Sequence, residues 1–460
     1  MSQGAGVVIV GGGIAGLSAA YDLAKAGTPY TLFEKLPRTG GVIQTTARDG
    51  CIVEGGPDSF ISQKPEALAL IKELGLESEV IGSNDATRVT YILRHGRLVR
   101  LPEGIRMIVP TRVWPLLQSP LLGWGTKLRM GLELLRKPVS NPDRSVADFV
   151  IDHFGKETLD YLAEPLLSGV YGGDPREMSV ISVLGAFAEM EAKSGSLSRA
   201  VLKQSRAPKS QASGALFRTL RGGLGTLTAK LAEGLTVCQA EVTAIESAAS
   251  GFRVRAGGDW IEASNVILAC PAWAAAGLVA PLDAALGGLL SRIPYTSSVT
   301  VAMGYDAATF DGRGSDGRGG GHGFLIPRVE RRRMAACTFV NAKFDFRAPA
   351  NRVLLRCFFG GAGDDAVLDE SDESLVNMAR EELRTILGLT STPLFTSISR
   401  WPRSMAQYTV GHSVRLKEIQ ARAAAIRGLF LAGNGYTGIG IPDCIRMGRA
   451  AAASAVKRVS

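Results

Sequence analysis

The sequence predicts an α/β protein built on a Rossmann-like domain, and three observations lead to this fold class. Residues 7–16 read VVIVGGGIAG, in which a short β-branched run precedes three glycines. Residues 17–34 continue with a helical pattern and a second apolar run that ends in an acid. Residues 429–449 again place an apolar run before a glycine-rich turn and a helix. Strand, glycine turn, helix and strand in this order are typical of a dinucleotide-binding domain.

The first glycine turn predicts a phosphate-binding loop, because each glycine of a GxGxxG motif has a separate task. Gly11 permits the tight turn, Gly13 lets a pyrophosphate approach the backbone, and Gly16 lets the helix pack on the strand. The helix N-terminus offers unpaired N–H groups to the phosphates. Glu34 ends the second strand, where a carboxylate can accept hydrogen bonds from ribose hydroxyls. The predicted contacts are Gly11, Gly12, Gly13, Ile14, Ala15, Gly16 and Glu34.

A second glycine pair follows Glu34 and indicates whether the dinucleotide is NAD or FAD. Residues 34–45 read EKLPRTGGVIQT. Arg38 can neutralise a phosphate, and Gly40 and Gly41 admit more cofactor close to the backbone. The stretch resembles the extended FAD motif of glutathione-reductase-like and amine-oxidase-like flavoproteins, and an NAD domain does not need it. The sequence therefore predicts FAD, with further contacts at Lys35, Arg38, Gly40, Gly41 and Val42.

The C-terminal stretch LFLAGNGYTGIGIPDC, residues 429–444, predicts a second approach to the flavin. A helix that begins near residues 439–442 could aim backbone N–H groups at flavin N1 and O2, where negative charge develops on reduction. The alternative is an alanine-rich helix that only docks on the domain, and both interpretations can hold together. The predicted contacts here are Gly433, Ile439, Gly440 and Ile441.

Five further motifs carry a closer resemblance. They are EGGPDSF (54–60), SGVYGGDPREMSV (168–180), RGGLGTL (221–227), QYTVGH (407–412) and AGNGYTGIGIPDCI (432–445). In type and order they resemble the porphyrinogen oxidases of haem biosynthesis, a family that includes oxygen-dependent protoporphyrinogen oxidase and bacterial coproporphyrinogen III oxidase. The resemblance runs nearly from end to end.

The resemblance implies three domains. The glutathione-reductase-like FAD domain would comprise residues 1–80, 222–290 and 411–460. A mixed α+β substrate domain would comprise 81–98, 180–221 and 291–410, and a mostly helical insert would comprise 99–179. The backbone of Val242 would lie beside the adenine, and the remaining cofactor residues would be Gly56, Pro57, Asp58, Ser59 and Trp401.

The resemblance also implies the substrate residues. Arg88 matches the family's propionate-binding arginine, while Arg94, Arg97 and Arg100 stand close by as alternatives. Gly169 matches a glycine whose backbone lies against the macrocycle, and its alternative is a plain turn. His322 stands where plant and animal members have a ring-stacking Phe, so Phe324 could substitute; His322 could stack, meet a carboxylate or lie in solvent.

The expected activity is that of the family. Noncovalent FAD would remove six electrons from protoporphyrinogen IX in three hydride steps to form protoporphyrin IX, and O₂ would reoxidise the flavin with formation of H₂O₂. Coproporphyrinogen III is the alternative substrate by the same mechanism. An amine or polyene oxidase, and a non-catalytic binding protein on the same fold, are further alternatives. The flavin N5 accepts the hydride, so we assign no catalytic side chain.

Composition bounds the partners and the compartment. Lys and Arg total 52 against 43 acidic residues, and this net charge of +9 favours anionic partners. The sequence carries no RNP-type or zinc-finger signature, so we expect no nucleic acid as a partner. Six cysteines without a CxxC pair predict neither a metal site nor disulfides, which favours the cytoplasm.

Residues 110–137 mix Leu and Trp with Arg and Lys. This segment could lie on the inner face of the cell membrane, pack within the domain or form a homodimer.

Overall fold

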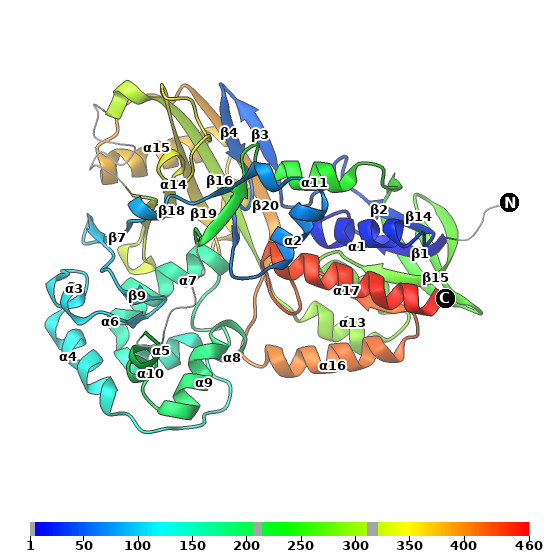
Figure 1. The fold of residues 1–460 in the computed structure, drawn as a ribbon, viewed down its shortest axis with the longest axis horizontal. Helices are drawn as coiled ribbons and strands as arrows, with labels where there is room; N and C mark the ends of the chain where they lie inside the picture. The colour runs from blue at the N-terminus through cyan, green and yellow to red at the C-terminus, as the bar shows by residue number, and fades with distance from the viewer. Residues whose placement is uncertain (1–4, 206–213, 311–320, 460) are drawn as a thin grey trace.

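The computed structural model describes residues 5–205, 214–310 and 321–459, which form two seven-stranded sheets, three small sheets and a group of helices (Figure 1). The predicted α/β class is confirmed. Both sheets take strands from distant parts of the chain, so neither is built from one continuous segment.

The first sheet has the strand order β12-β2-β1-β15-β14-β13, with β21 paired to β15. Its β1, β2, β12, β15 and β21 pair in parallel, while β13 and β14 add an antiparallel hairpin. β1 carries Val7, Val8 and Ile9 with no exposed surface, as expected of a central parallel strand covered on both faces. Its strands are β1 (Ala5–Val10), β2 (Tyr30–Glu34), β12 (Val237–Gln239), β13 (Val242–Ala248), β14 (Gly251–Ala256), β15 (Asp259–Leu268) and β21 (Leu429–Leu431).

Helices α1 (Ile14–Lys25) and α17 (Ile441–Val459) pack together beside this sheet (Figure 1). They approach so closely that a Cβ on Gly448 would lie 2.1 Å from the carbonyl oxygen of Ala15. The two glycine-rich turns of the sequence thus precede two neighbouring helices. Around them lie α2 (Glu66–Glu73), α11 (Gly225–Ala232), α12 (Ala272–Val279), α13 (Ala284–Ser291) and α16 (His412–Ala425).

The second sheet has the order β20-β16-β19-β18-β17-β7-β8 and is antiparallel except where β17 joins β7. α15 (Asp372–Leu387) packs against its core with Leu375, Ala379 and Leu383. The strands are β7 (Thr90–Arg94), β8 (Arg97–Arg100), β16 (Tyr295–Asp306), β17 (Gly323–Leu325), β18 (Met334–Phe339), β19 (Arg352–Gly360) and β20 (Phe395–Ala406).

The helical part fills the lower left of Figure 1 and has a hydrophobic core of its own. Residues 180–205, which we assigned to the substrate domain, contribute Leu184, Phe187, Leu197 and Val201 to this core, so they pack with the helices instead. The helices are α3 (Val113–Gln118), α4 (Trp124–Leu132), α5 (Val146–Phe154), α6 (Lys156–Thr158), α7 (Glu164–Tyr171), α8 (Val180–Val183), α9 (Gly185–Ser194) and α10 (Leu197–Ser205).

The remaining elements are short. The small sheets are formed by β3 (Thr45–Arg48) with β4 (Cys51–Glu54), by β5 (Phe60–Ile61), β11 (Phe217–Leu220) and β6 (Val80–Gly82), and by β9 (Ile105–Arg106) with β10 (Val109–Pro110). α14 (Val340–Lys343) and single turns such as η2 (Asp85–Thr87) and η3 (Glu133–Leu135) complete the elements used below.

Candidate functional site

The glycine turn after β1 adopts a conformation that only its residue types allow. Gly11 has a φ of +106°. A Cβ on Gly16 would lie 1.9 Å from the carbonyl oxygen of Gly11, so α1 can approach β1 only with glycine at this position. Ile14 and Ala15 are buried in the first turn of α1 and hold its N-terminus against the sheet.

Glu34 holds the turn from the end of β2. Its Oε2 accepts the backbone N–H of Gly12 at 2.7 Å, and its Oε1 accepts that of Leu36 at 2.8 Å. The side chain is buried, which orders the carboxylate beside the glycines. The position predicted for a ribose-binding acid is therefore occupied by a preorganised acceptor.

The two glycine stretches predicted from the sequence lie side by side. The backbone N–H of Gly40 donates to the carbonyl of Gly12 at 2.8 Å, and Gly13 and Gly40 form a parallel bridge. A Cβ on Gly13 would meet only Gly41 Cα, at 3.9 Å. The backbone here is thus bare on one side, the geometry that a pyrophosphate needs for close approach.

The Arg38 side chain binds the backbone of the second glycine stretch. Its guanidinium donates to the carbonyls of Gly41 at 2.7 Å and of Thr39 and Ile43 at 3.3 Å. Burial lowers the Arg38 pKa, and the nearby Glu34 opposes this shift. Arg38 therefore stabilises the loop itself, and the predicted phosphate contact would be additional.

Trp401, in β20, joins Gly55 and Gly56 to the second sheet. Its indole N–H donates to Gly55 O at 2.8 Å, and a Cβ on Gly56 would lie 3.6 Å from its ring. The Arg38 guanidinium stands 5.9 Å from the centre of the Trp401 ring. Trp401 is far from Arg38 and Gly56 in the sequence, and the fold brings the three side by side.

Asp58 faces protein cations. Lys343 donates to its carboxylate at 2.8 Å and Arg356 Nη1 lies 3.5 Å away. Burial opposes ionisation, but Lys343 and Arg356 outweigh it and hold the Asp58 pKa well below its usual range. Arg356 also donates to Gly56 O at 2.6 Å, so this buried cluster orders residues 56–59, in which Ser59 donates to Asp58. Sequence reasoning missed Arg356, because its role depends on pairing between distant segments.

The C-terminal loop approaches the first glycine turn. A Cβ on Gly433 would meet only Cys270 O, at 3.9 Å, and a Cβ on Gly11 would lie 3.1 Å from Cys270 N. α17 begins at Ile441, directly after Gly440, and the first backbone N–H groups of a helix have no partner within it. The buried Tyr436 hydroxyl has no hydrogen-bond partner among the described residues, which leaves a donor in this loop for a ligand or water.

The sequence also predicts cofactor contacts at Lys35, Val42 and Val242. Lys35 stands 5.9 Å from the centre of the Trp273 ring, and Val42 is exposed between Gly41 and Ile43. Val242 begins β13 in the sheet that contains β1. The contacts predicted for Lys35, Pro57, Val242 and Ile439 remain predictions.

Arg88 and His322 lie next to each other where β7 begins. The backbone N–H of His322 donates to Val89 O at 2.7 Å, and the His322 Nε2 bonds Asn84 O at 2.9 Å. Burial lowers the His322 pKa, and the side chain is only slightly exposed. His322 therefore does not lie free in solvent.

Arg88 is exposed and lines a cavity of about 570 Å³ together with Arg100 and Arg112. Glu103 bridges the latter two arginines, at 3.1 Å from Arg100 and 3.6 Å from Arg112. Three cations and one acid give this cavity a positive balance suited to carboxylates.

Arg94 serves the fold. It donates to the Leu121 carbonyl and to Glu157 at 2.7 Å, which joins β7 to the helices. Arg94 was one of the alternative carboxylate-binding arginines, but its guanidinium is already held by the protein's own groups. Arg97 is exposed and does not line the cavity.

The structure contradicts the substrate role expected of Phe324. Its side chain is 1% exposed, lies in the core of the second sheet and meets Phe339 with ring centroids 5.9 Å apart. Its neighbour Leu325 points the other way, and a Cβ on Gly169 would lie 3.3 Å from Leu325 Cδ2. Side chains alternate along a strand, so Leu325 and not Phe324 reaches Gly169.

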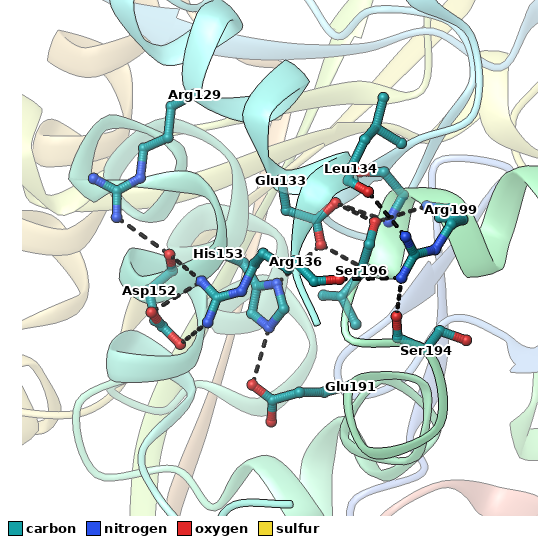
Figure 2. A network of polar contacts seen from close by, with 12 residues as sticks. Arg129, Glu133, Leu134, Arg136, Asp152, His153, Glu191, Ser194, Ser196 and Arg199 are labelled. Carbon is teal, nitrogen blue, oxygen red and sulfur yellow. Dashed lines mark hydrogen bonds and ion pairs between the residues drawn. The ribbon is translucent and has the colours of Figure 1, made fainter. Parts of the chain in front are cut away.

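A buried ion-pair network joins the helices (Figure 2). His153 on α5 bonds Glu133 Oε1 at 3.0 Å through Nδ1 and Glu191 Oε1 at 3.1 Å through Nε2. Burial opposes ionisation of Glu133, but hydrogen bonds from His153 and the 196–198 turn outweigh it and lower its pKa. The network therefore holds η3, α5 and α9 together.

Asp152, His153 and Glu191 place ligand atoms within 4.8 Å of one another, a spacing compatible with a metal ion. However, Arg136 donates to Asp152 at 2.7 Å and Arg144 to Glu191 at 2.5 Å (Figure 2 shows the former). These cations already neutralise the carboxylates, so we interpret the cluster as part of the ion-pair network.

An apolar stripe, defined as Trp124, Leu128, Leu132 and Leu135, lies on the outside of α4 and η3. These side chains are 72%, 67%, 58% and 76% exposed. The first three follow at four-residue spacing and so share one helix face. The alternative that residues 110–137 pack within the domain is therefore wrong for these four. Among the described residues, no helix has the length and apolar character needed to cross a bilayer.

Comparison with protein families decides the class. The model of the flavin-containing amine oxidoreductases matches residues 14–456, which begin at the first residue of α1 and include Gly40, Gly41 and most of α17. The chain belongs to this family. This flavin amine oxidoreductase is thus an enzyme, and its flavin supplies a two-electron acceptor.

Individual relatives show which members of the family the chain is similar to. Over 98% of this chain and 97% of the relative, the flavoenzyme is 35% identical to "Coproporphyrinogen III oxidase" of Bacillus subtilis. It is 29% identical to the chloroplastic protoporphyrinogen oxidase of Nicotiana tabacum, over 95% of this chain and 85% of the relative. A crystal structure from Exiguobacterium sp. 255-15, provisionally assigned as a protoporphyrinogen oxidase, has a TM-score of 0.87 at 31% identity and covers 99% of this chain and 100% of its own.

The residues present fit a flavin dinucleotide. The flavoenzyme has a bare backbone at Gly13 and Gly433, a buried acceptor at Glu34 and helix N-termini at α1 and α17. Together these can take a pyrophosphate, a ribose and the reducible end of a flavin.

Proposed function

We propose that this flavoenzyme oxidises coproporphyrinogen III to coproporphyrin III with FAD as its cofactor and O₂ as the acceptor. The observation that carries this proposal is full-length similarity at 35% identity to a protein with that name. The sequence favoured protoporphyrinogen IX and kept coproporphyrinogen III as the alternative. The order changes because the plant protoporphyrinogen oxidase is the more distant relative, at 29% identity.

FAD would be bound without a covalent bond. The two glycine stretches supply phosphate contacts and Glu34 a ribose contact, as described above. Burial raises the pKa of the Cys444 and Cys270 thiols to about 12 each, so neither is a ready nucleophile for a tether.

The positive cavity supports a tetracarboxylic substrate. A guanidinium can bind a carboxylate through two parallel hydrogen bonds, and Arg88 is not engaged by an acid among the described residues. Coproporphyrinogen III carries four carboxylates and protoporphyrinogen IX two. The guanidinium groups of Arg88, Arg100 and Arg112 can therefore bind more carboxylates of coproporphyrinogen III than of protoporphyrinogen IX.

The protein would position the substrate while the flavin accepts each hydride. The macrocycle would lie against the backbone of Gly169, and Arg88 would hold its carboxylate edge. Each two-electron step also removes a proton from the macrocycle, and we assign no side chain to accept it. The domain boundaries given above, revised to place 180–205 with the helices, are part of the proposal.

Side-by-side turnover of the two porphyrinogens tests the proposal. Purified protein is supplied with each substrate at equal concentration in air, and porphyrin fluorescence and H₂O₂ are followed. We expect a higher kcat/KM for coproporphyrinogen III. Preference for protoporphyrinogen IX would reverse the assignment, and failure to oxidise either would remove it.

We further propose that the apolar stripe rests on the surface of an anionic bilayer. Exposed Arg129 and Lys137 accompany the stripe, and the chain has a net charge of +9. A basic amphipathic surface gains from both apolar burial and attraction to anionic lipid. Such contact would hold a cytoplasmic enzyme at the inner face of the cell membrane, and a homodimer through the stripe is the competing outcome.

A further inference from the structure

The segment 407–412, QYTVGH, contacts the C-terminal loop first through the hydroxyl of Tyr408. The Tyr408 hydroxyl donates to Asn434 O at 2.8 Å and accepts the backbone N–H of Gly438 at 2.8 Å. Tyr408 is 5% exposed, and burial raises its pKa, so the phenol stays protonated and can donate and accept at once. The two contacts bracket the loop on either side of Tyr436.

His412 secures the middle of the same loop. Its Nε2 bonds Tyr436 O at 3.1 Å, and because a carbonyl can only accept, this nitrogen carries the proton. Its ring stacks on Tyr408 with centroids 4.1 Å apart and planes at 11°. Tyr408 and His412 therefore form one rigid pair with three attachments to residues 434–438.

The opposite side of this segment is attached to the helical part. Ser179 N donates to Tyr408 O at 2.8 Å and Val410 N to Glu177 O at 2.9 Å. Gln407 Nε2 donates to Tyr171 O at 2.7 Å. These partners belong to the stretch 168–180, which also contains Gly169. One short segment thus connects the predicted macrocycle contact to the predicted flavin contact.

We propose that Tyr408 and His412 are positioning residues for the flavin: they fix the loop 433–441, and with it the N-terminus of α17, relative to the stretch 168–180. This inference rests on the flavin site and not on the identity of the substrate. A porphyrinogen assay that failed would leave it untouched.

Removal of the phenol oxygen tests the proposal. Tyr408→Phe keeps the ring stacked on His412 but frees Asn434 O and Gly438 N. We expect the dissociation constant for FAD, measured by flavin fluorescence on the apoprotein, to rise about tenfold to a hundredfold. We also expect the visible circular dichroism of the bound flavin to change, because the loop loses two of its three attachments to Tyr408 and His412.

A matched control separates positioning from general stability. Tyr305 is 1% exposed and its hydroxyl contacts only Met303 Sδ among the described residues, away from the loop. Tyr305→Phe should leave FAD affinity and the flavin spectrum as in the wild type. An FAD affinity of Tyr408→Phe within twofold of the wild type, or an equal loss in Tyr305→Phe, would overturn the proposal.

His412 gives a second measurement if Tyr408→Phe does not fold. His412→Asn can still donate to Tyr436 O, whereas His412→Leu cannot. We expect His412→Leu to lose FAD affinity and His412→Asn to recover part of it. Equal affinity of the two variants would count against a role for this hydrogen bond and thus against the proposal.

Discussion

The backbone N–H of Gly40 lies 2.8 Å from the carbonyl oxygen of Gly12, and this contact makes one site of two glycine stretches. The first stretch follows β1 and the second follows β2, which are neighbours in the parallel sheet. Parallel neighbours end at the same edge of a sheet, where such folds bind nucleotides. The bare backbone at Gly13 is a consequence of this arrangement.

Gly13→Val should abolish flavin binding without unfolding the protein. Gly13 has extended backbone angles that any residue adopts, and its Cβ would enter open space, with Gly41 Cα at 3.9 Å. The side chain would then occupy the volume needed by a pyrophosphate. Absorption at flavin wavelengths and the melting temperature check this, and a fully yellow variant would contradict it.

Gly16→Ala, in contrast to Gly13→Val, should lower the stability of the fold itself. Its Cβ would lie 1.9 Å from Gly11 O, so α1 would have to move away from β1. Overpacking of this kind costs about 1–3 kcal/mol, or more where backbone must shift. We expect a lower free energy of unfolding in urea, even for the apoprotein. An apoprotein of wild-type stability would mean that α1 does not pack as described.

Arg88→Ala should lower kcat/KM for a porphyrinogen about tenfold to a hundredfold, because a charge-assisted bidentate contact contributes about 1.5–3 kcal/mol. The change should fall mainly on KM, and flavin content should not change. Arg88→Lys should recover activity only in part, since an ammonium lacks the guanidinium fork. Arg97→Ala is the control, because Arg97 is exposed and does not line the cavity. Equal kinetics of both alanine variants would remove Arg88 from the site.

Acid precipitation of the purified enzyme should release the flavin into the supernatant. Burial raises the pKa of Cys444 and of Cys270 to about 12, and neither thiol is ionised at neutral pH. The ratio of flavin in supernatant and pellet is the measurement. Flavin retained in the pellet would identify a covalent bond that the geometry does not suggest.

The free energy of unfolding should decrease as pH falls below 6.5, in part through His322 and His412. Burial lowers the pKa of each below its ordinary value of 6.5, so the folded protein keeps them neutral while the unfolded chain takes up protons. Their contribution is complete above pH 6.5 and is lost as pH falls through the folded-state pKa values. His322→Gln and His412→Gln should each flatten the pH dependence of urea unfolding. A slope unchanged in both variants would exclude this cause.

Trp124→Gln combined with Leu128→Gln should weaken sedimentation with anionic phospholipid vesicles. Both side chains are mostly exposed, at 72% and 67%, so the folded state should lose little stability. Vesicles without anionic lipid should bind the wild type less, because part of the attraction is electrostatic. A wild type that does not bind vesicles but changes from dimer to monomer on substitution would show that the stripe joins two subunits.

The local geometry of the proposed cofactor site was largely predictable from the sequence, because its requirements are local. A tight turn, a close approach to phosphate and a helix packed on a strand each require glycine at set spacing, and these requirements are visible in residues 11–16. The acid at Glu34 follows from the same motif, and the structure places it against Gly12 N. These features depend on backbone angles and on contacts that a missing side chain permits.

The sequence by itself therefore determined the α/β class, the flavin motifs and their order along the chain. Only the tertiary structure decided which similar residues serve the fold and which remain free to bind. Arg94 is bound to Glu157, whereas Arg88 faces a cavity. Phe324 is buried, whereas its neighbour Leu325 reaches Gly169. The physical reason is that burial and ion pairing depend on distant partners, here the pairing of β17 with β7 and the packing of helices on that sheet edge.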